Sequence, residues 1–421
     1  MAVFALAFAD VCQHCLRILH DIPLWVLFLS VVAAIIGATV LLYGLLFALA
    51  PVPREPFPEE TTYQTISEDG TVTEPKPLPC WQNDLRRVAG KPVAVNEAEL
   101  FMSVVVPAYN EEDRLPGMLE EAVNYLERAY GTLNTRMEQD KKVGQDASRT
   151  TRQRKTTTKA NGQPRTVKSS SPLHGWEILI VSDGSTDKTV ETAFAFAKDH
   201  QLSLHPRGHR GPWTLESIEG VHIPPGTIRV VTLKKNRGKG GAVTHGMKYV
   251  RGQYVVFADA DGASKFDDLG KLVAACQQIE DDNGRGVAVG SRAHLVGSEA
   301  VVKRSKLRNF LMHSFHITIR LLTPPVTASI KDTQCGFKLF SRASLPYIVP
   351  YMHTEGWIFD VEMLMLAEFS RIPVVEVPVG WREVKGSKLN VIWDSIGMAW
   401  GLAMLRAAWG LGVYRRNGMV S

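Results

Sequence analysis

Two aspartates two residues apart, Asp259 and Asp261, follow directly after the apolar run YVVFA. Alternate residues of an extended chain point to the same side, so the two carboxylates can share one cation. Hard carboxylate oxygens suit Mg²⁺ or Mn²⁺, which keep further positions free for diphosphate oxygens. A turn that caps the helix after Gly262 would also explain the pair. We predict a metal site at Asp259 and Asp261, because similar polar clusters follow other apolar runs.

Three of these clusters carry groups that could bind a phosphorylated ligand. The run EILIVSD ends at Asp183 in S-D-G-S-T-D, where capping of the next helix explains the residues after the glycine but not Asp183 itself. An earlier run ends in V-P-A-Y-N-E-E. Residues 234–242 (KKNRGKGGA) bring three glycines and four cations to a helix start, where backbone N–H groups and the helix dipole favour phosphate. A basic surface turn is the alternative for this last segment.

The elements that must position these groups are short apolar runs alternating with amphipathic stretches. Strands are predicted at 103–109, 177–183, 228–234, 254–259 and 287–292, and helices near 114–130, 187–200, 239–250 and 265–280. This alternation is typical of an α/β fold with a mainly parallel sheet covered by helices on both faces. Ligands of such sheets bind beyond the carboxyl ends of the strands, which is where the polar clusters fall.

A hydrophobic segment precedes this part of the chain. Residues 22–50 contain no charge over 29 residues, more than the roughly 20 that a membrane-spanning helix needs. A cleaved signal peptide is the alternative, but its apolar part is usually about half as long. The predicted organisation is an N-terminal segment (1–21), a transmembrane helix (22–50), a tether (51–100), a catalytic core (101–300), an interfacial helix (301–325), an acceptor-side part (326–390) and a C-terminal apolar or interfacial helix (391–421).

The charge of the chain is concentrated in one insertion. The net charge is +5, but residues 131–171 hold ten Lys and Arg against three acids, so the rest of the chain carries −2. We predict that this insertion is disordered, and the lack of interleaved aromatic residues argues against RNA binding. The five cysteines are too sparse for a disulfide framework and indicate a reducing compartment, although Cys12 and Cys15 form a C-x-x-C.

Two segments are predicted to lie at a membrane surface. The segment 301–325 combines cations at 303, 304, 306, 308 and 320 with an apolar face. The segment 391–421 is apolar but is broken by Asp394 and Arg406, which favours interfacial contact over a second span. Core packing, or a homo-oligomer formed through these helices, is the alternative.

Taken together, the motifs in this order and spacing resemble the family 2 glycosyltransferases of the GT-A fold. D-T-Q-C-G-F-K (332–338), G-W-I-F-D-V-E (356–362) and W-R-E-V-K-G-S-K (381–388) resemble the polyprenyl-phosphate branch. D-A-D-G-A after YVVFA, with one N-terminal anchor, is most similar to the members that transfer glucose to dolichyl phosphate. The resemblance covers about 101–390, apart from the insertion and a second irregular segment at about 203–225.

The resemblance implies roles for individual residues. The uracil and ribose of UDP would be held by Pro107, Tyr109, Glu111 and Asp183. The metal and the diphosphate would lie between Asp259 and Asp261. Phosphates of the donor or the acceptor would be bound by Arg292, Arg382 and Lys388. The expected substrate-binding set also includes Lys239, Ala260, Gln334 and Trp357. Related enzymes that transfer mannose often have a polar third metal ligand where this chain has Ala263. Water, diphosphate oxygens or another residue would then complete the coordination.

The implied reaction is inverting transfer of glucose from UDP-glucose to dolichyl phosphate. A phosphate monoester, with a second pKa near about 6, is already largely deprotonated at pH 7, so no dedicated base is required. Asp360 lies where related enzymes with hydroxyl acceptors keep their base, and we expect it to position the acceptor or a cation. An ordinary acid at a helix start is the alternative. The expected catalytic set is therefore Asp259, Asp261, Asp360, Arg382 and Lys388.

The expected product, dolichyl β-D-glucosyl phosphate, would be a sugar donor for protein N-glycosylation. The expected partners are the two substrates and the lipid bilayer, without nucleic acid, and the expected location is the endoplasmic reticulum membrane with a cytosolic catalytic domain. Alternatives are a dolichyl-phosphate mannosyltransferase, another family 2 transferase or a non-catalytic nucleotide-sugar-binding scaffold. A processive polysaccharide synthase is disfavoured because the sequence has no Q-x-x-R-W motif.

Overall fold

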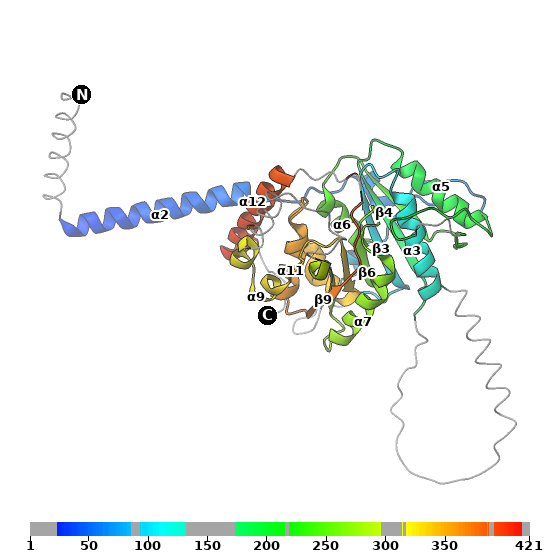
Figure 1. Cartoon of the computed structure of the whole chain (residues 1–421). Coiled ribbons are helices and arrows are strands. Elements are labelled where there is room, and N and C mark those ends of the chain that lie inside the picture. The colour runs from blue at the N-terminus through cyan, green and yellow to red at the C-terminus, as the bar shows by residue number, and fades with distance from the viewer. Residues whose placement is uncertain are drawn as a thin grey trace, which may run out of the picture. The chain divides into compact units, whose positions relative to one another are not determined.

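The computed structural model describes residues 23–85, 93, 95–131, 173–214, 219–295, 314, 317–384, 386 and 391–414. The chain divides into two compact units, Met1–Pro51 with Met404–Arg415, and Val52–Ala403 with Arg416–Ser421. The first unit contains helix α2 (Leu24–Leu49), the long blue helix in Figure 1. Of the described helices, α2 is the one long and apolar enough to cross a membrane. The predicted span at 22–50 is thus a helix of suitable length and composition.

The second unit is built on a seven-stranded sheet with the order β5-β4-β3-β6-β8-β7-β9. The strands are β3 (Leu100–Ala108), β4 (Trp176–Asp183), β5 (Ile228–Leu233), β6 (Gly252–Ala258), β7 (Val287–Ser291), β8 (Phe337–Ser341) and β9 (Val374–Pro378). All neighbouring strands are parallel except at β8, which runs antiparallel to β6 and β7. The predicted mainly parallel sheet is confirmed. The five predicted strands are present, whereas β8 and β9 were not predicted.

Helices cover both faces of this sheet, as predicted. Alternate residues of β3 point to opposite faces. Met102, Val104 and Val106 lie in one hydrophobic core with α3 (Leu115–Tyr130), α5 (Thr189–Leu202) and α7 (Leu269–Ile279). The opposite face is covered by α6 (Lys239–Met247) and α11 (Phe359–Phe369). Figure 1 shows α6 on one side of β3 and β4, and α3 on the other.

The remaining elements are short, apart from one C-terminal helix of 20 residues. They are the 3₁₀ helices η1 (Pro58–Thr61), η2 (Trp81–Asp84), η3 (Phe266–Asp268), η4 (Ala293–Leu295), η5 (Arg342–Ser344) and η6 (Val349–Tyr351), and the helices α9 (Pro325–Ser329), α10 (Leu345–Ile348) and α12 (Val391–Gly410). The remaining strands, β1 (Thr62–Tyr63) and β2 (Lys76–Pro77), form a separate two-stranded sheet.

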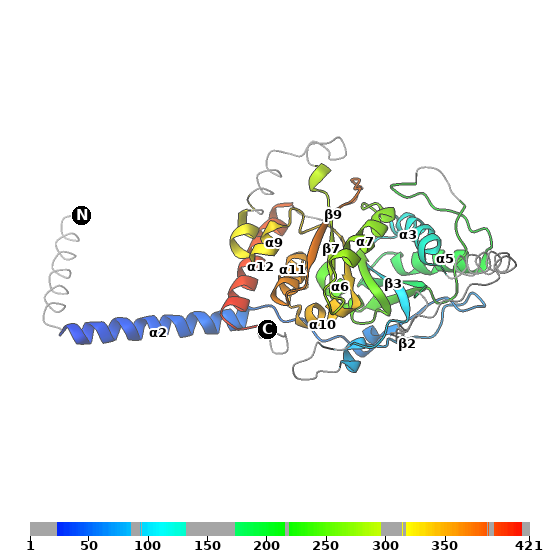
Figure 2. The same cartoon turned by 90° about the horizontal axis from the view of Figure 1, so that it is seen from below.

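From residue 52 on, the described part of the segment predicted as a tether, 51–100, belongs to the second unit and packs against its sheet. Gln64 pairs with Val230 of β5, and the Thr65 hydroxyl donates to the Ile228 carbonyl at 2.6 Å. Trp81 is 2% exposed and donates from its indole nitrogen to the Met247 carbonyl at 2.6 Å. Figure 2 shows this segment in blue around the label β2. Its elements have two to four residues, too few for a recognisable period.

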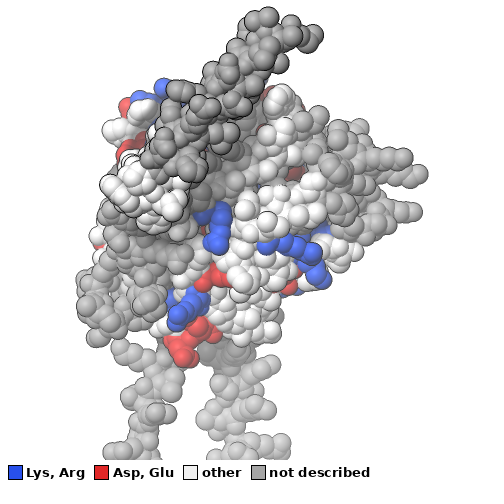
Figure 3. All heavy atoms as spheres, turned by 90° about the vertical axis from the view of Figure 1, so that its left-hand side faces the viewer, with Lys and Arg blue, Asp and Glu red and all other residues white. Residues whose placement is uncertain are grey.

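The predicted membrane-surface and insertion segments are only partly described. Residues 132–171 lie outside the described residues, as do the predicted cations at 303–308. Residues 317–322 are helical, with Ile317 and Leu321 exposed and Ile319 buried. On the side of the molecule in Figure 3, the described basic residues are few and separated, with acidic residues between them. Interfacial binding by 301–325 and 391–421 stays a prediction.

Candidate active site at the carboxyl ends of the strands

The loops that follow β3 and β4 are joined by hydrogen bonds. Asn110 adopts a left-handed conformation with φ of 55°, which asparagine tolerates better than most residues. Its side-chain oxygen accepts from the Thr186 N–H at 2.7 Å, and its own N–H donates to the Ser185 hydroxyl at 3.1 Å. The Glu111 N–H donates to the Thr189 hydroxyl at 2.7 Å. The motifs V-P-A-Y-N-E-E and S-D-G-S-T-D therefore form one rim, which carries Pro107 and the 39% exposed Tyr109.

Asp183 lies at the end of β4 and is 3% exposed. One carboxylate oxygen accepts from the Arg237 N–H at 2.7 Å, which ties the strand end to the glycine-rich segment 234–242. Burial raises the pKa of Asp183 to about 6, despite the opposing hydrogen bonds from Arg237 and Gly238. Gly184 has φ of 68°, and a side chain there would press against the Asn236 nitrogen. The tight turn after Asp183 thus requires glycine.

The glycines of 234–242 allow this segment to pack against residues 353–357. The Gly241 N–H donates to the Glu355 carbonyl at 3.0 Å, and a side chain at Gly240 would overlap Phe359. The Arg237 guanidinium is ion-paired with the Glu355 carboxylate. Glu362, fully buried in α11, accepts from the Thr354 N–H at 2.8 Å. The basic turn left open by the sequence is therefore a packed loop at the start of α6.

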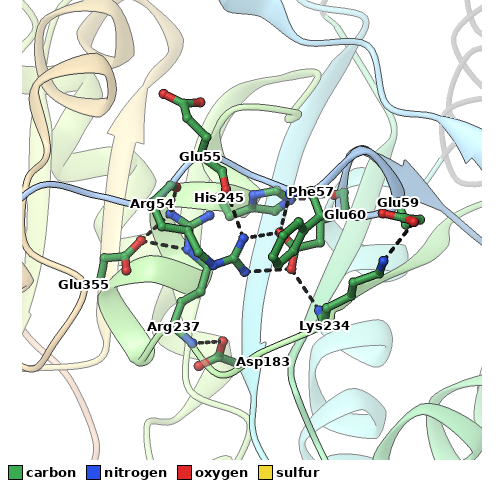
Figure 4. A network of polar contacts seen from close by, with 10 residues as sticks. All are labelled: Arg54, Glu55, Phe57, Glu59, Glu60, Asp183, Lys234, Arg237, His245 and Glu355. Atoms are coloured by element: carbon green, nitrogen blue, oxygen red, sulfur yellow. Dashed lines mark hydrogen bonds and ion pairs between the residues drawn. The ribbon is translucent and has the colours of Figure 1, made fainter.

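Figure 4 shows how the chain just after residue 51 reaches this loop. Glu60 is fully buried and accepts two hydrogen bonds from the Arg54 guanidinium, at 2.8 and 2.7 Å, and one from the Lys234 N–H at 2.9 Å. Burial alone would raise the pKa of Glu60, but these donors and the Phe57 N–H lower it to about 2. The Arg54 carbonyl accepts from Arg237 at 2.7 Å. Sequence analysis missed this support, because its residues lie in the segment predicted as a tether.

Asp259 and Asp261 follow β6 and face two protein cations. The Lys239 ammonium lies 2.6 Å from Asp259 Oδ1, and the Arg114 guanidinium lies 3.9 Å from Asp261 Oδ2. Burial raises the pKa of Asp261, and the neighbouring Asp259 carboxylate adds to the rise. Burial lowers the pKa of Lys239, but Asp259 and Asp360 outweigh it, so the net shift is upward. Two crowded carboxylates are a favourable donor set for a hard divalent cation, so the residues fit Mg²⁺ or Mn²⁺.

Gly336, from D-T-Q-C-G-F-K, lies against this pair. The Asp259 N–H donates to the Gly336 carbonyl at 3.2 Å, and any side chain at Gly336 would overlap the Asp259 carboxylate. The Asp261 carboxylate accepts from the Ala263 N–H at 3.0 Å. Ala263, which has no polar side chain to offer a metal, contributes its backbone N–H to orient Asp261. Ala260, between the two aspartates, is 3% exposed.

Asp360 is a buried charge with a buried partner. It lies in the first turn of α11, is 3% exposed, and forms an ion pair with Lys338 of β8, which is fully buried. The Lys338 ammonium also donates to the Cys335 carbonyl at 2.7 Å. Burial raises the pKa of Asp360, while the charges of Lys338 and Lys239 oppose that rise. Asp360 thus lies close enough to Lys239, the ion-pair partner of Asp259, for the two charges to stabilise each other.

The remaining predicted residues are distributed around this cluster. Arg292 forms a bidentate ion pair with Asp332, in which Nε and Nη2 donate to the two carboxylate oxygens at 2.7 and 2.8 Å. Arg382 donates to the Pro212 carbonyl at 2.6 Å and lies over the Trp213 ring, while its own N–H donates to the Ala263 carbonyl. The centre of the Trp357 ring lies 5.8 Å from the Lys239 ammonium nitrogen. The Gln334 amide contacts the Met398 sulfur at 2.9 Å. Lys388 lies outside the described residues.

Comparison with known proteins identifies the group to which this arrangement belongs. The family model "Glycosyl transferase family 2" matches residues 164–347. A protein of Saccharomyces cerevisiae named dolichyl-phosphate beta-glucosyltransferase is 38% identical over 411 residues, which cover 96% of this chain and 99% of that protein. The chain belongs to the dolichyl-phosphate β-glucosyltransferase family. The resemblance predicted from the sequence motifs is confirmed.

Other dolichyl-phosphate β-glucosyltransferases are similarly related. Those of Dictyostelium discoideum and Homo sapiens are 37% and 35% identical over 316 and 315 residues, and each match covers 75% of this chain and 77% of the relative. Among solved structures, glucosyl-3-phosphoglycerate synthase of Mycobacterium tuberculosis with Mn²⁺, UDP and phosphoglyceric acid is 17% identical. That match has a TM-score of 0.39 and covers 74% of this chain and 79% of the other.

Proposed function

We propose that this protein transfers glucose from UDP-glucose to dolichyl phosphate with inversion, giving dolichyl β-D-glucosyl phosphate and UDP. The observation that carries this proposal is the 38% identity to a dolichyl-phosphate β-glucosyltransferase over nearly the whole chain. The arrangement of Asp183, Lys239, Asp259 and Asp261 around parallel strand ends is consistent with it. The product would serve as a sugar donor for protein N-glycosylation.

The donor would bind along the rim formed by the ends of β3, β4 and β6. Asp183 would accept a hydrogen bond from uracil, with Pro107, Tyr109 and Glu111 beside the base and ribose. The diphosphate would lie at the start of α6, where Lys239 adds a positive charge to the positive end of the helix dipole. Asp259 and Asp261 would hold Mg²⁺ or Mn²⁺, which when bound supplies positive charge opposite the leaving diphosphate.

The acceptor phosphate would attack without help from a base, because it is already largely ionised at neutral pH. Asp360 would then act as a positioning residue, since its carboxylate is held by Lys338 and acts on Lys239. Arg292, Arg382 and Lys388 would supply charge for phosphates. Trp357 and Gln334 would complete the substrate site, and α2 would anchor the protein in the endoplasmic reticulum membrane.

Purified protein in detergent is expected to form a glucosylated lipid from UDP-glucose and dolichyl phosphate, but not from UDP-glucose and dolichol, which lacks the phosphate. The measurement is the amount of radiolabelled sugar in the lipid phase. A parallel reaction uses GDP-mannose in place of UDP-glucose. Transfer of mannose in place of glucose would support a mannosyltransferase, growth of a polymer would support a synthase, and UDP-glucose binding without transfer would support a scaffold.

Sealed microsomes test the proposed orientation with the same assay. If the catalytic unit is cytosolic, protease added outside should destroy the activity and cleave within 101–390. Protection of this region until detergent is added would place the unit on the luminal side.

The affinity for UDP-glucose is expected to fall as the pH decreases below about 6. Asp183 has a pKa raised to about 6 by burial, so its carboxylate is ionised above that pH and protonated below it. A hydrogen bond to a charged acceptor contributes about 1.5–3 kcal/mol, so full protonation should raise Kd by about 10- to 100-fold. At pH 5, one unit below this pKa, proton linkage limits the rise to about 10-fold. Titration calorimetry with UDP-glucose from pH 5 to 8 at saturating metal checks this, because the diphosphate diester itself does not titrate in that range.

Asp183→Asn is the control for this pH dependence. Its neutral amide can still accept from the Arg237 N–H, so the glycine-rich segment should keep its position. The variant should bind weakly at all pH values. A profile that depends on pH as strongly as in the wild type would assign the effect to another group.

A further inference from the structure

Glu120, His200 and His209 form a cluster on the helical layer that covers one face of the sheet. Glu120 lies in α3, His200 in α5, and His209 in the connection after α5. One ligand atom from each residue lies within 4.8 Å of the others. Glu120 and His200 are fully buried, and the His209 side chain is 36% exposed. None of the three belongs to the proposed catalytic set.

The orientation of His200 leaves a lone pair facing Glu120. Nδ1 of His200 lies 2.9 Å from the Val221 carbonyl oxygen, which can only accept, so this nitrogen carries the proton. The second ring nitrogen, Nε2, lies 3.2 Å from Glu120 Oε2, but the contact lacks hydrogen-bond geometry, and this nitrogen has no hydrogen-bond partner among the described residues. In neutral His200, two acceptors would face each other in a buried space, so the pair requires either a second proton or a cation.

Hydrogen bonds hold the Glu120 carboxylate in one orientation. Oε1 accepts from the Asn124 amide at 3.0 Å, and Oε2 accepts from the His209 N–H at 3.1 Å. Nδ1 of His209 lies 3.4 Å from Oε2, at the limit of a hydrogen bond. A carboxylate and two imidazoles thus converge around one point.

We propose that Glu120, His200 and His209 bind one Zn²⁺ ion, with water as a fourth ligand, at a site separate from the catalytic one. Two imidazoles and a carboxylate are a ligand set that zinc favours over Mg²⁺. Zinc-bound histidines usually donate their other ring N–H to a carboxylate, a backbone carbonyl or water, and His200 donates to the Val221 carbonyl. The exposed side of His209 leaves room for water and for entry of the ion.

Such an ion would fix the connection between α5 and β5 to α3. Beyond His209, this connection packs closely against α3, because a side chain at Gly211 would overlap the Gly117 carbonyl and Glu121. The Trp213 N–H donates to Glu121 at 2.7 Å, and its indole donates to the Gly262 carbonyl at 3.2 Å, one residue after Asp261. The zinc site is therefore structural, and it would hold Trp213 against the turn that carries the catalytic aspartates.

Metal analysis of the full chain tests the site directly. Protein expressed with added zinc, purified in detergent with excess Mg²⁺ and desalted, is expected to contain about one zinc per chain by mass spectrometry. His209→Ala removes a ligand that is partly exposed, so the fold should survive. Removal of a residue that only supports a metal ligand lowers metal affinity by about 10- to 100-fold. Because His209 would itself be a ligand, the zinc affinity of His209→Ala should fall by at least as much. Binding to Asp259 and Asp261 is excluded if Asp261→Asn keeps its zinc.

His205→Ala is the matched control. His205 lies in the same connection, is exposed and pairs with Glu219, outside the cluster. It should retain the zinc of the wild type, and X-ray absorption at the zinc edge should show two imidazoles and oxygen ligands. The proposal would be overturned if the wild type, His205→Ala and His209→Ala all contained the same amount of zinc, well below one ion per chain. The cluster would then be a hydrogen-bonded pair of histidines and a glutamate without a metal. Because neither readout uses glucose transfer, the result is independent of the proposed activity.

Discussion

Asp261→Asn is expected to lower kcat for glucose transfer by about 10²- to 10³-fold at saturating Mg²⁺ or Mn²⁺. Asp261 lies at the end of β6, is oriented by the Ala263 N–H, and is 3.9 Å from its nearest ion-pair partner, Arg114. Removing one group that stabilises transition-state charge costs about 2.7–4 kcal/mol in well-studied enzymes. Loss of this negative charge should also raise the metal concentration needed for half-maximal activity.

Initial rates measured across metal concentration, together with UDP-glucose binding, check this prediction. Asp267→Asn is the matched control, because Asp267 is an exposed aspartate of η3 whose ion pair with Arg128 is also exposed. The control should retain wild-type kcat and metal dependence. Full turnover of the wild type in excess chelator, or unchanged kcat in Asp261→Asn, would remove the metal from the proposed mechanism.

Lys338→Met is expected to lower the free energy of unfolding by about 3–5 kcal/mol. Both members of the Lys338–Asp360 pair are buried, with side chains 0% and 4% exposed. Removing one partner leaves an uncompensated charge in the interior, which costs about this much. For a unit of this size, Tm should fall by about 4–8 °C, as measured by differential scanning calorimetry in detergent. Asp360→Asn should destabilise for the same reason.

The double variant Lys338→Gln with Asp360→Asn separates stability from catalysis. Both charges are removed together, so Tm should recover most of the loss of either single variant. If Asp360 only positions Lys239 and the acceptor, this variant should retain measurable turnover, with a pH profile governed by the phosphate pKa near about 6. A stable double variant that binds both substrates and is as inactive as Asp261→Asn would make Asp360 the catalytic base.

Local patterns were sufficient for much of the fold. The apolar runs before Asp183 and Asp259 predicted β4 and β6 to within two residues at each end, because burial on both faces of a parallel sheet leaves a continuous apolar signal. The strands β8 and β9 were missed for the opposite reason. β8 carries Lys338 as its second residue and β9 carries Glu376 in its middle, so neither presents an uninterrupted apolar run.

Much of the candidate site was likewise readable from residue types and spacing. Asp183, Asp259 and Asp261 follow strands that are parallel neighbours of β3, so their side chains had to gather at one edge. The glycines of 234–242 indicated a close approach, but the approaching chain is 353–357, more than a hundred residues later. No local signal identifies such a partner.

By itself, the sequence determined the strand–helix alternation, the apolar helix, the acidic residues at the strand ends and the family. These follow from burial periods and motifs that extend over a few residues. Only the tertiary structure decided which charges are paired, such as Lys338 with Asp360 and Glu60 with Arg54 and Lys234, and which histidines meet Glu120. A buried charge must be compensated, but any opposite charge that the fold brings close can compensate it, so the choice depends on contacts between distant segments.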